Sequence, residues 1–250
     1  MRHLLLAALV LAASPAFAEE KLSATDLSVR TALAFKAPDA VVLKMLPAGF
    51  ELNSPTAGPT KGSNFGITLI DYIMVQDPEG KPVPPRTTIA MNIPAKKTAT
   101  GEPVGVVFNG LIDPAAVPGP YGVFGAARIT VDRRSHTEPD GKSVIKETWE
   151  AKADDGSALE IAIEFVRGVP TRGKVEAKLH SASRPEFYRI YKFEQAADVA
   201  RSTATGVDRV TNISIKATGP RFAPLFNGSE QVISVTSIPS YARSIYVPVM

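Results

Sequence analysis

The chain has 250 residues, no cysteine and a formal net charge of +3. The lack of cysteine excludes thiol nucleophiles and thiolate metal sites, and the histidines His3, His136 and His180 lack the spacing of a histidine metal site. A charge this small and dispersed forms no basic stripe, so we expect no nucleic-acid partner.

The first segment, Met1–Ala18, has the pattern of a signal peptide. A cationic start precedes the apolar run Leu4–Ala13, and the small-x-small cleavage pattern Ala16–Ala18 follows. A membrane-spanning helix needs about 20 apolar residues, so this run is too short to span a bilayer. We therefore expect residues 19–250 to be one exported domain, periplasmic or secreted, with no membrane span.

Two segments are candidates for short helices. In the first, Asp39 is a candidate N-cap, an apolar stripe follows, and Pro47 stops the helix. The second is the alanine-rich segment Lys192–Ser202. The rest of the chain is punctuated by proline and glycine.

The remaining apolar runs are short and have the alternation of β-strands. Asp155–Gly156 lies between two of them and is a strong hairpin signal. About nine or ten strands are expected in total, giving a mainly antiparallel β (α+β) domain that closes into a barrel or cone. The clearest strand candidates are Phe65–Val75, Arg86–Ile93, Pro103–Gly110, Arg128–Val131, Lys142–Ala151, Ser157–Val166, Glu186–Phe193, Asp208–Lys216 and Gln231–Ile238.

Three stretches resemble the acetoacetate decarboxylase family. Asp39–Leu52 contains an "LPxGxE"-like phrase after the helix, the glycine stretch "GPYGVFGAAR" from Gly119 opens a strand, and Gly219–Pro248 is similar to the family's closing segment. The resemblance implies a cone-like β-barrel with an apolar interior, often oligomeric and free of cofactors. It also implies a site inside the cone for a small keto acid or related carboxylate.

The sequence departs from the family where its paired lysines stand. Without gaps those positions are Ala127 and Arg128, and a shift by one residue gives Arg128 and Ile129. An arginine cannot form the Schiff base, because its side chain stays protonated at neutral pH. The resemblance therefore implies altered chemistry or no chemistry, and the catalytic residues stay unknown.

Arg128, Tyr121 and Phe124 are the ligand-binding candidates. Arg128 would clamp a carboxylate with its guanidinium, and the two aromatic rings would form the pocket wall. The alternative for Arg128 is a surface position at a strand start, like the one expected for Arg133 and Arg134.

Other titratable residues are weaker candidates. The pair Lys96–Lys97 lies in a polar, turn-like stretch and is expected to be solvated. Glu51, Asp71 and Glu79 are possible acids, but their spacing does not choose among them. Both histidines downstream of the signal peptide are expected at the surface or in loops.

Two functions remain open. The first is an exported enzyme that acts on a small keto acid or related carboxylate, either with altered chemistry or with a lysine at another position of the chain. The second is a noncatalytic binding protein that keeps the pocket. No nucleotide-binding glycine motif or nucleophile elbow is present, so no cofactor or metal is expected.

Overall fold

The computed structural model describes residues 19–249, which consist mainly of β-strands. The predicted signal peptide lies outside these described residues. The strands are β1 (Glu20–Lys36), β2 (Phe50–Leu52), β3 (Phe65–Gln76), β4 (Pro82–Val83), β5 (Thr87–Lys97), β6 (Pro103–Ile112), β7 (Phe124–Thr137), β8 (Ser143–Ala153), β9 (Ala158–Val166), β10 (Thr171–Ser181), β11 (Tyr188–Ser202), β12 (Val207–Asp208), β13 (Val210–Thr218) and β14 (Gln231–Pro248). The helices are α1 (Asp39–Val42) and the 3₁₀ helices Leu43–Met45 and Pro114–Ala116.

Seven strands pair in a circuit. Their order is β6–β10–β11–β14–β1–β3–β5, and β5 pairs back with β6. Within the circuit the strand pairs are antiparallel, except for the short parallel contact between β6 and β10. The mainly antiparallel β fold expected from the sequence is confirmed.

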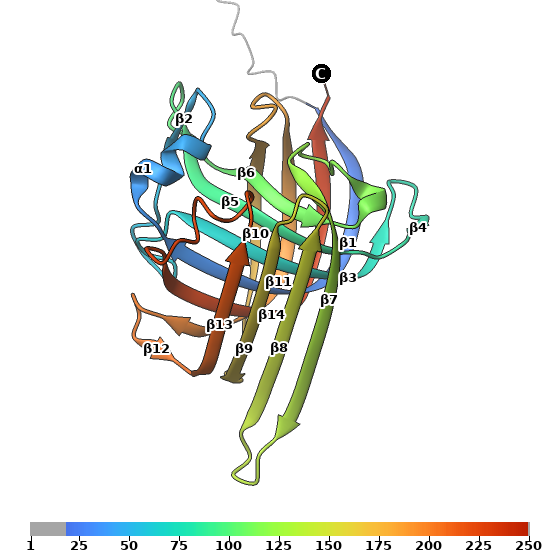
Figure 1. The fold of residues 1–250 in the computed structure, drawn as a ribbon. Helices are drawn as coiled ribbons and strands as arrows, with labels where there is room; N and C mark the ends of the chain where they lie inside the picture. Colours follow the sequence, from blue (N-terminus) through green and yellow to red (C-terminus); the bar gives the residue numbers. More distant parts are fainter. Residues whose placement is uncertain (1–18, 250) are drawn as a thin grey trace, which may run out of the picture.

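A second layer continues from β6 and covers one side of the circuit. The strands β7, β8, β9 and β13 form this layer, and Figure 1 shows them crossing in front of β1, β3 and β5. β7 begins beside β6 in a parallel contact and then pairs with β8 along the rest of its length.

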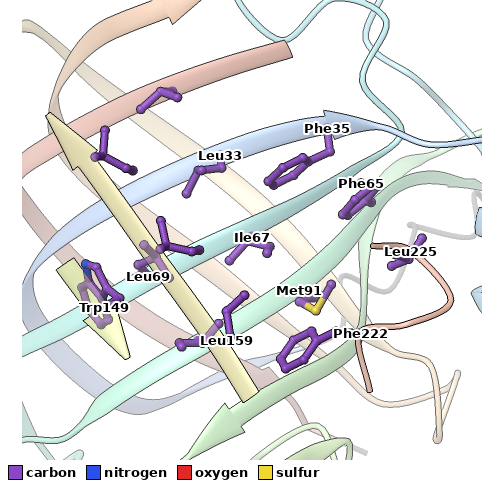
Figure 2. Close-up of a cluster of buried hydrophobic side chains, with 14 of the residues drawn as sticks. Leu33, Phe35, Phe65, Ile67, Leu69, Met91, Trp149, Leu159, Phe222 and Leu225 are labelled. Carbon is purple, nitrogen blue, oxygen red and sulfur yellow. The ribbon is translucent and has the colours of Figure 1, made fainter. Parts of the chain in front are cut away.

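The main hydrophobic core lies between the two layers. Figure 2 shows Leu33, Ile67 and Met91 from the circuit facing Trp149 and Leu159 from the second layer, and all of them are buried. Loop residues that follow β13, including Phe222 and Leu225, close one end of this core. Burial on this scale is the dominant stabilising contribution to the fold.

Side chains alternate between two environments along the circuit strands. On β1, β3 and β5 the odd-numbered Leu33, Leu69 and Met91 enter the core, while the even-numbered Arg30 and Thr68 face the opposite side. This follows from the two-residue period of a strand. The same three strands therefore supply both a core and an inner wall.

One polar link crosses the core. The carboxylate of Glu147 on β8 is buried and accepts a hydrogen bond from the Thr31 hydroxyl on β1 at 3.0 Å. It also accepts from Nε of Arg133 at 3.1 Å and from the Trp149 indole. Both oxygens of this buried carboxylate thus accept hydrogen bonds, as a buried charge requires.

The structure corrects several local expectations. Lys192–Ser202 is part of β11, not a helix, because it pairs with β10 and β14 on its two sides. Such pairing outweighs the helix propensity of its alanines. Asp39 is the first residue of α1 rather than its cap, and its carboxylate accepts from Lys36 and Asn64. Among the described residues, no helix is long and apolar enough to cross a membrane.

Candidate functional site

A cavity of about 580 Å³ lies on the inner side of the circuit, opposite the core. Its lining mixes aromatic and aliphatic side chains with charged ones. Four arginines and two aspartates carry the charge, leaving two positive charges in excess, and none of the lining residues is a lysine, histidine or glutamate. The interior is therefore less apolar than the resemblance implied. The charged lining residues are Asp26, Arg30, Asp77, Arg86, Arg189 and Arg243.

A buried ion cluster holds two of these arginines. Asp26 on β1 accepts from Nη2 of Arg30 at 3.2 Å and from Nε of Arg243 at 2.7 Å, one arginine on each carboxylate oxygen. All three side chains are buried. One carboxylate thus serves two guanidiniums, and the cluster keeps one net positive charge.

Tyrosines support both guanidiniums. The Arg30 carbon Cζ lies 3.4 Å from the centre of the Tyr241 ring, and that of Arg243 lies 4.3 Å from the centre of the Tyr191 ring. Such cation–π contacts hold a cation without neutralising it. Burial lowers the pKa of the Arg30 guanidinium, and the neighbouring Arg243 charge acts in the same direction. An anion placed beside Arg30 would oppose both of these effects on its guanidinium.

Donors remain free on this cluster. Arg30 uses Nε on the Ser28 hydroxyl and Nη2 on Asp26, and Arg243 uses Nε and Nη2 on Asp26 and the Tyr72 hydroxyl. Within residues 19–249, neither Nη1 group has a hydrogen-bond partner. Both arginines can therefore donate further hydrogen bonds.

Tyr121 and Tyr191 form a second polar point in the cavity. Their hydroxyl oxygens lie 2.5 Å apart, and both residues are buried. Two hydroxyls carry two protons and their mutual bond uses one, so the other is available to an acceptor. Burial, together with Tyr191, raises the pKa of Tyr121 well above its usual value. The Tyr121 hydroxyl therefore stays protonated at neutral pH.

The glycine stretch that precedes β7 brings this wall into place. Gly119 has a φ of +68°, a conformation that favours glycine. A Cβ at Gly119 would lie 2.8 Å from the Phe124 ring, and one at Gly110 on β6 would lie 2.5 Å from it. These two glycines make room for the Phe124 ring at the cavity wall.

Two of the three predicted ligand-binding residues line the cavity. Tyr121 and Phe124 are buried in its wall, although their contact with a ligand stays a prediction. Arg128 is exposed and lies outside the cavity, so the clamp position expected for it is corrected. Its neighbour Ala127 enters the core, and the strand period turns Arg128 to the opposite side, where it is paired in register with Lys152.

The other titratable candidates lie elsewhere. Lys96 and Lys97 end β5 and form ion pairs with Glu51 and Glu102 at 3.2 Å and 3.3 Å. Asp71 forms an ion pair with Arg133 instead of lining the cavity. Glu79, in a turn, is likewise outside the cavity lining.

The histidines differ from each other. His136 is exposed on β7, as expected. His180 is buried between Phe50 and Tyr188, and its Nδ1 lies 2.8 Å from the Pro185 carbonyl oxygen. The surface position expected for His180 is therefore wrong, and burial lowers the pKa of its imidazole.

The sequence did not reveal the ion cluster. Asp26 and Arg243 lie 217 positions apart and meet because β1 pairs with β14. The only local signal was the i, i+4 spacing of Asp26 and Arg30, which is two strand periods and places both on one face. The spacing alone does not identify this segment as a strand, so it does not predict the cluster.

This fold is that of the acetoacetate decarboxylase-like enzymes, which confirms the resemblance at the level of the fold. The enduracididine biosynthesis enzyme MppR complexed with pyruvate is 12% identical, with a TM-score of 0.57 over 89% of this chain and 88% of that one. An acetoacetate decarboxylase-like enzyme from Sphingomonas wittichii RW1 is 11% identical, with a TM-score of 0.56 over 92% and 93%. The acetoacetate decarboxylase of Legionella pneumophila is 12% identical, with a TM-score of 0.51 over 98% of both chains. No protein-family model and no curated protein matches the sequence.

Proposed function

We propose that this protein binds a small organic carboxylate, such as a keto acid, in the cavity of the β-strand circuit. The observation that carries the proposal is the Asp26–Arg30–Arg243 cluster. It keeps one uncompensated positive charge in a buried place and leaves the Nη1 groups of both arginines without partners. A carboxylate accepts such donors in a charge-assisted pair. The structural neighbour MppR, complexed with pyruvate, supports a small-molecule ligand by analogy of fold.

Thr88 adds a donor at the same end of the cavity. Its hydroxyl oxygen is buried and has no hydrogen-bond partner within the described chain. Ile70 is in register with both Arg30 and Thr88, so the two polar residues lie in one cross-strand row. A ligand oxygen near Arg30 would satisfy this hydroxyl.

Binding without a Schiff base fits this lining best. The lining residues offer guanidiniums and phenols, and both oxygens of the buried Asp26 are already engaged. We therefore place a noncatalytic binding protein ahead of a lysine-dependent decarboxylase, and we retain the export predicted from residues 1–18 as part of the proposal.

Calorimetric titration with pyruvate and acetoacetate tests this function. Arg243→Gln should weaken binding roughly ten- to hundredfold, because it removes a charge-assisted hydrogen bond. Arg128→Gln, which replaces an exposed arginine outside the cavity, is the matched control and should leave the affinity unchanged. If Arg243→Gln fails to fold, Tyr191→Phe takes its place as the test. This change keeps the ring under Arg243 and removes only a hydroxyl, so we expect a smaller loss of affinity.

Borohydride trapping tests the absence of Schiff-base chemistry. Wild-type protein incubated with acetoacetate and borohydride should show no mass increase by intact-mass spectrometry. A borohydride-dependent adduct mapped to one lysine would overturn the noncatalytic proposal. Titrations that show no binding of either acid would overturn the carboxylate ligand itself.

A further inference from the structure

Arg189 on β11 is a second cationic point of the cavity and is separate from the Asp26 cluster. It lines the cavity, and its Nε is buried without a hydrogen-bond partner. Across residues 19–249, no carboxylate lies within ion-pair distance of it. A buried guanidinium N–H without an acceptor is unfavourable unless a ligand supplies one.

The two cationic points lie at different levels of the same wall. Arg243 is in register with Phe193 on β11, and Arg189 lies four positions before Phe193 on that strand. At about 3.3 Å per residue, the two levels are roughly 13 Å apart at the backbone. Residues 189, 191 and 193 share one strand face, so Arg189 and Tyr191 both face the cavity.

The Tyr121–Tyr191 hydroxyl pair lies between the two levels. Burial dominates the raised pKa of Tyr121, and the charges of Arg189 and Arg243 both act against that rise. Its phenol is therefore within electrostatic range of both guanidiniums. The aliphatic side chains of Leu179 and Ile245 line the cavity as well, so the two charged points are joined by a surface of mixed polarity.

We propose that the cavity takes a dicarboxylate, with one carboxylate at Arg30 and Arg243 and the other at Arg189. This inference rests on the proposed function and specifies the ligand class of the same site. The two positive charges in excess in the lining match the two negative charges of such a ligand. The cavity volume of about 580 Å³ is in the range of pockets for ligands larger than a three-carbon keto acid.

Calorimetry with matched acid pairs tests this inference. Succinate, glutarate, adipate and suberate are compared with butyrate, valerate, hexanoate and octanoate, so that only the second carboxylate differs within a pair. We expect at least one dicarboxylate to bind roughly tenfold more tightly than its monocarboxylate. The chain length with the greatest preference reports the separation of the two binding points.

The variant Arg189→Gln should remove the dicarboxylate preference, because it lowers the affinity for the preferred dicarboxylate roughly tenfold more than the affinity for the matched monocarboxylate. Because Arg189 has no ion-pair partner among the described residues, its replacement should not disturb the fold, which circular dichroism checks. Arg128→Gln is again the control and should keep the preference.

The outcomes separate the two proposals. If monocarboxylates bind through Arg243 but no dicarboxylate binds more tightly, the second binding point is wrong and the proposed function stands. If Arg189→Gln lowers the affinities for a dicarboxylate and its matched monocarboxylate by the same factor, the proposed binding of the second carboxylate at Arg189 is also wrong. If no acid of either series, and neither pyruvate nor acetoacetate, binds, both proposals fail.

Discussion

Tyr241 shows how one residue can serve both the fold and the site. Its ring lies under the Arg30 guanidinium and stacks on Phe193 at 4.7 Å between ring centres. Burial raises its pKa from 10.0 to about 12, although the charges of Arg30 and Arg243 oppose this change. The ring is therefore a neutral support for a cation across the physiological range.

The raised pKa predicts an alkaline instability. Since the folded pKa lies above the unfolded one, the stabilising contribution is complete below pH 10 and is lost as the pH rises to about 12. The slope per group is about 1.4 kcal/mol per pH unit in that window. Urea unfolding at a series of pH values should show a shallower decline for Tyr241→Phe than for wild type. If the free energies of unfolding of the two proteins fall in parallel as the pH rises, a raised pKa of Tyr241 is contradicted.

Gly110 on β6 tests how tightly the elements around the cavity are packed. A Cβ there would lie 2.5 Å from the backbone oxygen of Ile89 on the paired strand and 2.5 Å from the Phe124 ring. Gly110→Ala should therefore destabilise the protein by about 1–3 kcal/mol and displace Phe124 from the cavity wall. Thermal unfolding and ligand titration measure the two effects.

The matched control is Gly173→Ala on β10. Nothing lies within 4 Å of a Cβ at Gly173, and a surface substitution of this kind changes stability by less than about 0.5 kcal/mol. Equal melting temperatures for the two variants would show that the close approach at Gly110 is not constraining.

The elements that the sequence predicted well have one regularly apolar face, which lies in the core. Phe65–Gln76 and Ala158–Val166 are such strands, and the alternation of their apolar residues was visible. The sequence does not predict β1, because the face that lines the cavity carries the charged residues Asp26 and Arg30. Charged residues in a sequence usually indicate a loop rather than a buried strand. β10 was missed because the first half of that strand, Thr171–Glu176, is exposed.

The site was predictable only in part, for the same reason. Tyr121 and Phe124 stand beside a conspicuous glycine stretch, and both do line the cavity. The cluster around Asp26 depends on pairing between the two ends of the described chain, and no local spacing encodes that pairing. The site residues that follow the glycine turn were thus predictable, and those that meet only through the pairing of distant strands were not.

At the scale of the whole molecule, Trp149 reports on both layers. It is the single tryptophan of the chain, is fully buried, and contributes to the core that the circuit shares with the second layer. If residues 19–250 form one domain, urea unfolding followed by Trp149 emission should coincide with unfolding followed by far-UV circular dichroism. Two separated transitions would show that the layers unfold independently and would contradict the one-domain prediction.

The alternation of core and cavity residues along β1, β3 and β5 has an evolutionary consequence. Ala32, Thr68, Ala90 and Asn92 face the cavity, while their immediate neighbours are fixed by the core. Substitutions at these four positions would change the cavity wall without replacing a residue of the main core, so they offer a route to new ligand preferences through single mutations. The scaffold can thereby diverge in selectivity while it conserves its architecture, and a saturation library at these positions would sample that diversity directly.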